Sequence, residues 1–124
     1  MIKIDKIQKI INNIKEIQFA YLFGSYADDT FNEYSDIDIA IFLDEKHNTF
    51  DRKLQIHHQL ELKLQKEIDL LVLNNAKNFY LLKNIFDNNI LLKDSKNDAR
   101  VMFELSKHHE IIDYIEFKRM LDVA

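Results

Sequence analysis

Two aspartates, Asp36 and Asp38, stand at the start of an apolar run that reads "DIDIAIFL". Residues two apart on a strand project from the same face, with Cα atoms about 6–7 Å apart. Two carboxylates held together beside a core repel one another, which raises the pKa of at least one of them. A divalent cation removes that conflict, and Mg²⁺ prefers oxygen ligands together with water and substrate phosphates. The pair therefore predicts a magnesium site.

A third carboxylate, Asp69, lies in a similar apolar segment, "EIDLLVL", at residues 67–73. If this segment pairs beside the strand of Asp36 and Asp38, all three side chains reach one site. Three carboxylates on adjacent strands can hold two metal ions about 3.5–4 Å apart, the arrangement used for phosphoryl and nucleotidyl transfer. We therefore expect Asp36, Asp38 and Asp69 to be metal ligands and catalytic residues.

The single glycine of the chain, Gly24, directly precedes Ser25 and follows the apolar segment "IQFAYLF". Glycine lets backbone N–H groups approach an anion closely, and a serine hydroxyl adds a donor. The pair predicts a phosphate cradle beside the metal site, without the lysine and spacing of a P-loop. Taken singly, Gly-Ser is more often a turn and Asp-x-Asp more often a solvated strand end. The combination in one chain favours the functional interpretation.

The elements that position these residues follow from the periodicity of apolar side chains. We expect an α/β (α+β) fold with a small mixed sheet flanked by helices, in one domain spanning residues 1–124. The predicted order begins with a helix carrying Ile7–Ile14, strands 17–23 and 36–43, and a helix from about 49 to 66. A strand at 67–73, a helix at 76–86 and a short edge strand at 90–92 follow. The last helix is opened by the capping box "SKND" at 95–98.

The predicted helix at about 49–66 has apolar residues at spacings of three and four. We expect one buried face and an N-terminal cap from Asn48 with Asp51. The residues expected on that face are Phe50, Leu54, His57, Leu60 and Leu64.

Composition sets limits on function. The chain has 124 residues, no cysteine and a formal net charge of −4. The absence of cysteine excludes disulfides and zinc–thiolate sites, and it favours a cytoplasmic location. The negative charge argues against direct nucleic-acid binding, which needs a basic surface. No apolar run approaches about 18 residues, so we expect no membrane span.

The motif "GS", ten residues and then "DID" resembles the signature of the nucleotidyltransferase superfamily that shares the polymerase-beta palm fold. The compact chain, the acid in "EIDLLVL" and the closing "FELSKHHEIIDYIEFKRML" look like the minimal nucleotidyltransferase (MNT) group. In that group the protein is often encoded beside a HEPN-domain toxin and acts as its antitoxin. The resemblance covers nearly the whole chain and is strongest over residues 19–43 and around Asp69.

The resemblance implies a role at each matching position. Gly24 and Ser25 would hold the nucleoside triphosphate, Asp36 and Asp38 would bind Mg²⁺, and Asp69 would complete the metal site and help deprotonate the attacking hydroxyl. Many relatives have arginine after the serine and glycine four residues after the first glycine, where this chain has Tyr26 and Asp28. These departures concern the shape of the loop and the choice of nucleotide.

The expected function is transfer of AMP from ATP, with two Mg²⁺ ions, to a hydroxyl of a HEPN toxin, with tyrosine as the acceptor. One alternative is an antitoxin that neutralises by binding alone, and another is a transferase for an aminoglycoside-type small molecule. The last two helices have broad apolar faces that serve either as core or as a partner interface. Those faces contain Phe79, Leu82, Phe86, Met102, Phe103, Phe117 and Met120.

Overall fold

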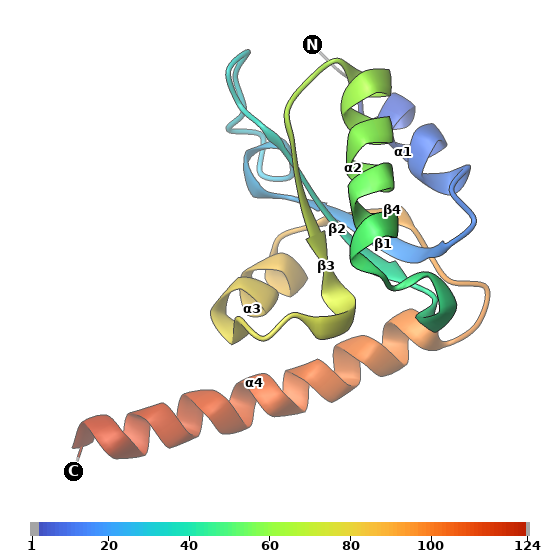
Figure 1. The fold of residues 1–124 in the computed structure, drawn as a ribbon. Coiled ribbons are helices and arrows are strands. Elements are labelled where there is room, and N and C mark those ends of the chain that lie inside the picture. The colour runs from blue at the N-terminus through green and yellow to red at the C-terminus, as the bar shows by residue number, and fades with distance from the viewer. Residues whose placement is uncertain (1–2, 124) are drawn as a thin grey trace.

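A four-stranded mixed sheet forms the centre of the molecule in the computed structural model, which describes residues 3–123 (Figure 1). The strand order is β3-β2-β1-β4. β1 (Ile17–Phe23) pairs antiparallel with β2 (Ile37–Leu43) and with β4 (Ile90–Lys93), whereas β3 (Ile68–Val72) runs parallel to β2. The predicted α/β class, mixed sheet and short edge strand are confirmed. β2 starts at Ile37, so Asp36 precedes the strand that was predicted to include it.

The helix α2 (Phe50–Leu64) makes the parallel pairing of β2 and β3 possible. Two parallel strands cannot be joined by a tight turn and need a crossover, usually helical. α2 supplies that crossover. The ring of His57 also donates from Nε2 to the Ile68 carbonyl oxygen at 2.7 Å, which ties α2 to the start of β3.

One face of the sheet is covered by α1 (Ile4–Asn12) and α2 (Figure 1). The odd-numbered residues of β2 lie in this aliphatic core, as the alternating pattern predicts. The predicted buried face of α2 is partly wrong, because Phe50 and Leu54 are 72% and 48% exposed. The buried residues are Ile56, Leu60 and Leu64, which are four apart and align more closely along a helix than the predicted set.

The opposite face of the sheet is covered by α3 (Phe79–Asp87) and α4 (Ala99–Val123). Its core is aromatic: Phe19, Tyr21 and Phe23 of β1 are buried here, as predicted for this strand. The Phe103 ring of α4 lies 5.7 Å from the Phe19 ring, measured between centroids. The two faces therefore differ in chemistry, with aliphatic packing on one and aromatic packing on the other.

Helix starts depart from the predicted caps. Thr49, rather than Asn48 with Asp51, caps α2 by accepting a hydrogen bond from the Arg52 N–H at 3.1 Å. α3 begins at Phe79 instead of residue 76, because residues 73–75 form a short 3₁₀ turn and Asn78 provides the cap. α4 begins at Ala99, later than the capping box predicted.

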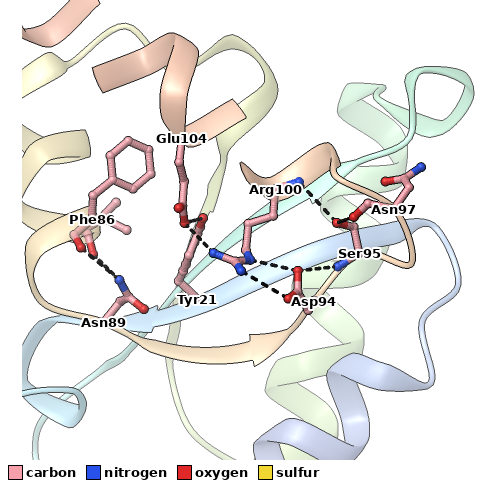
Figure 2. Close-up of polar contacts among 9 residues, drawn as sticks. Tyr21, Phe86, Asn89, Asp94, Ser95, Asn97, Arg100 and Glu104 are labelled. Atoms are coloured by element: carbon pink, nitrogen blue, oxygen red, sulfur yellow. Dashed lines mark hydrogen bonds and ion pairs between the residues drawn. The ribbon is translucent and has the colours of Figure 1, made fainter. Parts of the chain in front are cut away.

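The N-terminal turn of α4 is fixed to the sheet by a polar network around Arg100 (Figure 2). Its guanidinium donates to both carboxylate oxygens of Asp94, at 2.8 and 3.3 Å, and to Glu104 Oε1 at 3.1 Å. The hydroxyl of the buried Tyr21 on β1 also donates to Glu104 Oε1. Burial, then the hydrogen bond and charge of Glu104, raise the pKa of Tyr21. This network holds α4 at a defined place on the aromatic face.

A search of the described helices for a membrane span found none with sufficient length and apolarity.

Candidate active site

Asp38 and Asp69 lie opposite one another on neighbouring strands. β2 and β3 pair in parallel with Asp38 in register with Asp69. Because strand side chains alternate, Asp38 lies on the same face as Ala40, and Asp69 on the same face as Leu71. Ala40 and Leu71 belong to the aromatic core under α3 and α4. Both acids therefore project from that face of the sheet, at the end where β2 begins.

The sequence predicts repulsion between Asp38 and Asp36, whereas in the structure Asp69 is the carboxylate that acts most strongly on Asp38. Burial, then the charge of Asp69 and a hydrogen bond to its carboxyl group, raise the pKa of Asp38 to about 6 from its ordinary 3.8. The charge of Asp36 acts in the same direction and is the smallest cause.

Gly24 packs directly against Asp38, which explains why the chain has its glycine there. The residue has a φ of +71°, in the left-handed region that L side chains disfavour. A Cβ atom built on Gly24 would lie 2.1 Å from Oδ2 of Asp38. Any other residue would push the carboxyl group away or shift the backbone. The glycine therefore allows the end of β1 to approach Asp38 closely.

The segment after Gly24 forms a single 3₁₀ turn, Gly24–Tyr26. Ser25 is half-buried. Tyr26 is only 4% exposed and stacks on Phe31, with ring centroids 4.4 Å apart. Tyr26 is therefore part of the aliphatic-side core, which gives the departure from arginine at this position a structural explanation.

The three predicted acids are not equally placed. Asp38 is partly buried, whereas Asp36 and Asp69 are exposed. Within residues 3–123, no group of three or more His, Cys, Asp or Glu side chains has an arrangement that could hold a metal ion. The structure thus brings Asp38 and Asp69 together beside Gly24 and leaves Asp36 at the rim. The chemistry of the close pair, two carboxylates with no cationic partner, still fits a hard divalent cation.

Two cationic residues, Arg52 and Arg100, form ion pairs away from Asp38. Arg52 pairs with Glu16 at 3.0 Å, and Arg100 pairs with Asp94 and Glu104. Glu16 and Asp94 flank the end of the sheet opposite Asp38, since Ile17 pairs with Leu43 and Phe23 with Asp38. The network around Arg100 was not predicted, because only the folded sheet brings Tyr21 to Glu104, 83 residues away, although Asp94 and Glu104 themselves lie six and four residues from Arg100.

Comparisons with known proteins give independent evidence on this arrangement. A protein adenylyltransferase of Shewanella oneidensis, MntA, is 36% identical over 73 residues, which are 58% of this chain and 52% of that protein. A protein of Methanocaldococcus jannaschii, provisionally named a protein adenylyltransferase, is 35% identical over 81 residues, 64% of this chain and 81% of that protein. The present chain thus spans about half the length of the first relative and most of the second.

Solved structures share the fold. A crystal structure described as a toxin-antitoxin with AMP-PNP has a TM-score of 0.77 at 24% identity, covering 98% of this chain and 96% of that one. A second, described as a tri-AMPylated Shewanella oneidensis HEPN toxin in complex with an MNT antitoxin, has a TM-score of 0.68 at 23% identity, with 97% and 92% coverage. The family model "Polymerase beta, Nucleotidyltransferase" matches residues 5–98, which include every predicted site residue. The chain therefore belongs to the polymerase beta nucleotidyltransferase family.

Proposed function

We propose that this nucleotidyltransferase transfers the adenylyl group of ATP to a hydroxyl of a partner protein, a HEPN-domain toxin, and thereby acts as its antitoxin. The observation that carries the proposal is the pair of carboxylates of Asp38 and Asp69, in register on parallel strands and pressed against a side-chain-free position at Gly24. A structural role alone gives no reason for this repulsive and locally costly arrangement.

The reaction is a displacement at the α-phosphorus of ATP. The acceptor hydroxyl oxygen forms a bond to that phosphorus, the bond to the bridging oxygen of the β-phosphate breaks, and pyrophosphate leaves. Asp69, exposed and next to Asp38, accepts the hydroxyl proton. Gly24 and Ser25 bind the triphosphate through backbone N–H groups and the Ser25 hydroxyl, because both lie beside Asp38 at the end of β1.

Mg²⁺ is the cation we propose for this site, with two ions in the full reaction complex. Asp38 and Asp69 would hold it, with Asp36 joining from the rim, and phosphate oxygens of the nucleotide would complete its shell. When bound, Mg²⁺ polarises the phosphoryl oxygens and neutralises charge that develops in the transition state. The proposal is supported by the donor set, which offers only carboxylate oxygens and no thiolate or imidazole.

The donor and the acceptor are inferred from the relatives. MntA of Shewanella oneidensis is named a protein adenylyltransferase, and one similar structure is described as a complex with a tri-AMPylated HEPN toxin. Those names support ATP as donor and a protein as acceptor. We propose tyrosine as the acceptor residue, since its phenolic hydroxyl loses a proton more easily than serine or threonine.

A second candidate is neutralisation by binding without transfer. It is favoured by one observation: in the described part of the chain, three acids do not converge on a single point that would suit a metal ion. Under this alternative, Asp38 and Asp69 are remnants, and their removal leaves neutralisation intact.

Intact-mass measurement distinguishes the two candidates. The chain, the purified HEPN protein, ATP and Mg²⁺ are incubated together, and the mass of the HEPN protein is followed. We expect increments of one adenylyl unit with the wild type and none with Asp38→Asn/Asp69→Asn. An unchanged mass with the wild type would refute transfer to the partner. Adenylylation of an aminoglycoside under the same conditions would instead identify a small-molecule acceptor.

A further inference from the structure

The outward side of α4 exposes an unusual amount of apolar surface. More than half of the large apolar side chains that are exposed in the described residues belong to this one helix: Val101, Met102, Leu105, Ile112, Phe117, Met120 and Leu121, each 45–70% exposed. Ile111 is the side chain of α4 that belongs to the buried core. Exposed apolar surface of this extent on one helix marks a site of contact with another molecule.

Three of these residues form a straight stripe. At 100° per residue, Val101, Leu105 and Ile112 fall within about 40° of one another around the helix. With His108 between them, their spacing of four, three and four is that of a helix that packs along another helix. The stripe borders a groove of about 320 Å³ between α3 and α4, lined by Phe86, Val101, Glu104, Leu105 and His108. We name Val101, Leu105 and Ile112 the α4 stripe.

The stripe is carried on a rigid support. The Arg100 network fixes the first turn of α4 (Figure 2). The Phe103 ring packs on Phe42, with centroids 5.1 Å apart. Further along, the Tyr114 ring packs against Phe79 of α3 at 5.2 Å. These contacts use the inward side of the helix. The stripe is thus held facing outward and cannot turn inward without breaking them.

The stripe also lies on the side of the molecule where the chemistry is proposed. Asp38 and Asp69 project from the sheet face that α3 and α4 cover, and α4 crosses this face and continues beyond the sheet (Figure 1). A protein bound along α4 would therefore lie on the same side of the sheet as the two carboxylates. A partner on the α1 and α2 side would have the whole sheet between its hydroxyl groups and Asp38.

Charge decides against a second copy of this chain as the occupant. Arg119 continues the line of the stripe, five turns after Val101. Parallel pairing of two copies would place Arg119 against Arg119 and His108 against His108, and antiparallel pairing would place Arg119 against Val101. Arg119 pairs with Glu116 at 3.4 Å, and both side chains are exposed. A carboxylate from a different helix would complement it.

We propose that the α4 stripe binds an amphipathic helix of the acceptor protein, with apolar side chains at matching spacing and a carboxylate opposite Arg119. This inference rests on the proposed function for the identity of the acceptor, and it assigns the surface that holds the acceptor during transfer. Binding along a fixed helix would keep the acceptor hydroxyl near the site for a unimolecular step.

The test uses two matched double variants of the full chain. Leu105→Glu/Ile112→Glu places two charges in the stripe, and Ser106→Glu/Phe117→Glu places two charges on another exposed side of the same helix. Isothermal titration with the purified HEPN protein measures the affinity, and circular dichroism checks that both variants fold. We expect the stripe variant to bind at least about 100-fold more weakly, as for two central apolar contacts, and the other variant to bind within about threefold of wild type.

The outcomes separate the surface from the chemistry. Wild-type affinity in the stripe variant, or an equal loss in both variants, would overturn the stripe as the binding surface. Sedimentation that shows a stripe-dependent dimer of this chain alone would overturn the choice of occupant. If the stripe variant loses binding while the wild-type complex forms but transfers no adenylyl group, the surface is supported and the proposed function fails. Asp38→Asn/Asp69→Asn is expected to bind with wild-type affinity and transfer nothing.

Discussion

Acidic residues at the two ends of the sheet have opposite surroundings. Where β1 begins and β2 and β4 end, Glu16 and Asp94 each have an arginine partner, Arg52 and Arg100. The hydrogen bond from that partner lowers the pKa of each acid. At the other end, burial and the carboxyl groups of Asp69 and Asp36 raise the pKa of Asp38.

Asp44 fits the first group although its surroundings differ in detail. Burial acts to raise its pKa, but the hydrogen bonds from the ring and backbone N–H of His47 outweigh burial and lower it. One end of the sheet, which we call the paired end, thus neutralises its acids internally. The other, the unpaired end, leaves the carboxylates of Asp38 and Asp69 in mutual repulsion. This difference is the one that the proposed cation and nucleotide site at the second end would require, since stability alone would favour pairing there too.

The largest effect is expected on transfer. Asp38→Asn preserves shape and removes one charge at the unpaired end, and we expect adenylyl transfer to fall at least about 100-fold, as when a transition-state contact is lost. Asp44→Asn removes one charge at the paired end and serves as the control, with transfer within about twofold of wild type. Initial rates from intact-mass time courses measure both. Equal losses of transfer in Asp38→Asn and Asp44→Asn would show that the two ends of the sheet do not differ in function.

The next effect concerns stability at the paired end. Arg100→Met leaves Asp94 and Glu104 without their cation and the Tyr21 network half satisfied, so we expect a loss of about 1–3 kcal/mol in the free energy of unfolding. Urea denaturation measures it. Arg119→Met, at the exposed end of the same helix, is the control, with an expected change below about 0.5 kcal/mol. An unchanged free energy of unfolding in Arg100→Met would mean that α4 is held by aromatic packing alone.

At the unpaired end, removal of a charge should stabilise the protein. In EDTA, we expect Asp38→Asn to have a free energy of unfolding up to about 1 kcal/mol above that of wild type, once solvent screening of these half-exposed groups is allowed for, and therefore a higher melting temperature. Addition of Mg²⁺ should raise the melting temperature of wild type, because a ligand of the native state stabilises it by about 1.4 kcal/mol at ten times its Kd. The variant should respond much less. The measurement is thermal unfolding with and without Mg²⁺. A melting temperature of wild type that does not change with Mg²⁺ would argue against the cation at this end.

The unpaired end was largely predictable from the sequence, and the paired end was not. Asp38 and Asp69 stand in strongly patterned strands, and Gly24 is the one glycine, so their proximity followed from local pattern and a single assumption about strand pairing. Asp94 lies six residues before Arg100, and Glu104 lies four residues after it. Through Glu104 the network also reaches Tyr21, which is 83 residues earlier in the sequence.

Errors in the helices have the same origin. Apolar residues at positions 50 and 54 have the spacing of a buried face, yet the sheet contacts the side of α2 that carries Ile56, Leu60 and Leu64. A helix with apolar residues around much of its surface can be buried on more than one side, and periodicity does not choose between them. Tertiary contact makes that choice. The metal and catalytic roles of Asp36, Asp38 and Asp69 stay predictions.

The smallest expected effect is the pH dependence of the stability that Arg52 and Glu16 contribute at the paired end. Arg52 lowers the pKa of Glu16 below its ordinary 4.5 in the folded protein. A lowered pKa means that the unfolded chain binds more protons, so the pair stabilises the fold above about pH 4.5 and loses that contribution as pH falls through the folded-state value. Glu16→Gln should therefore cost less than about 1 kcal/mol at pH 7, as for a surface pair, and progressively less as the pH falls below about 4.5. Urea unfolding of both proteins across this range measures the difference, and a cost that persists at low pH would show that Glu16 acts through packing instead of charge.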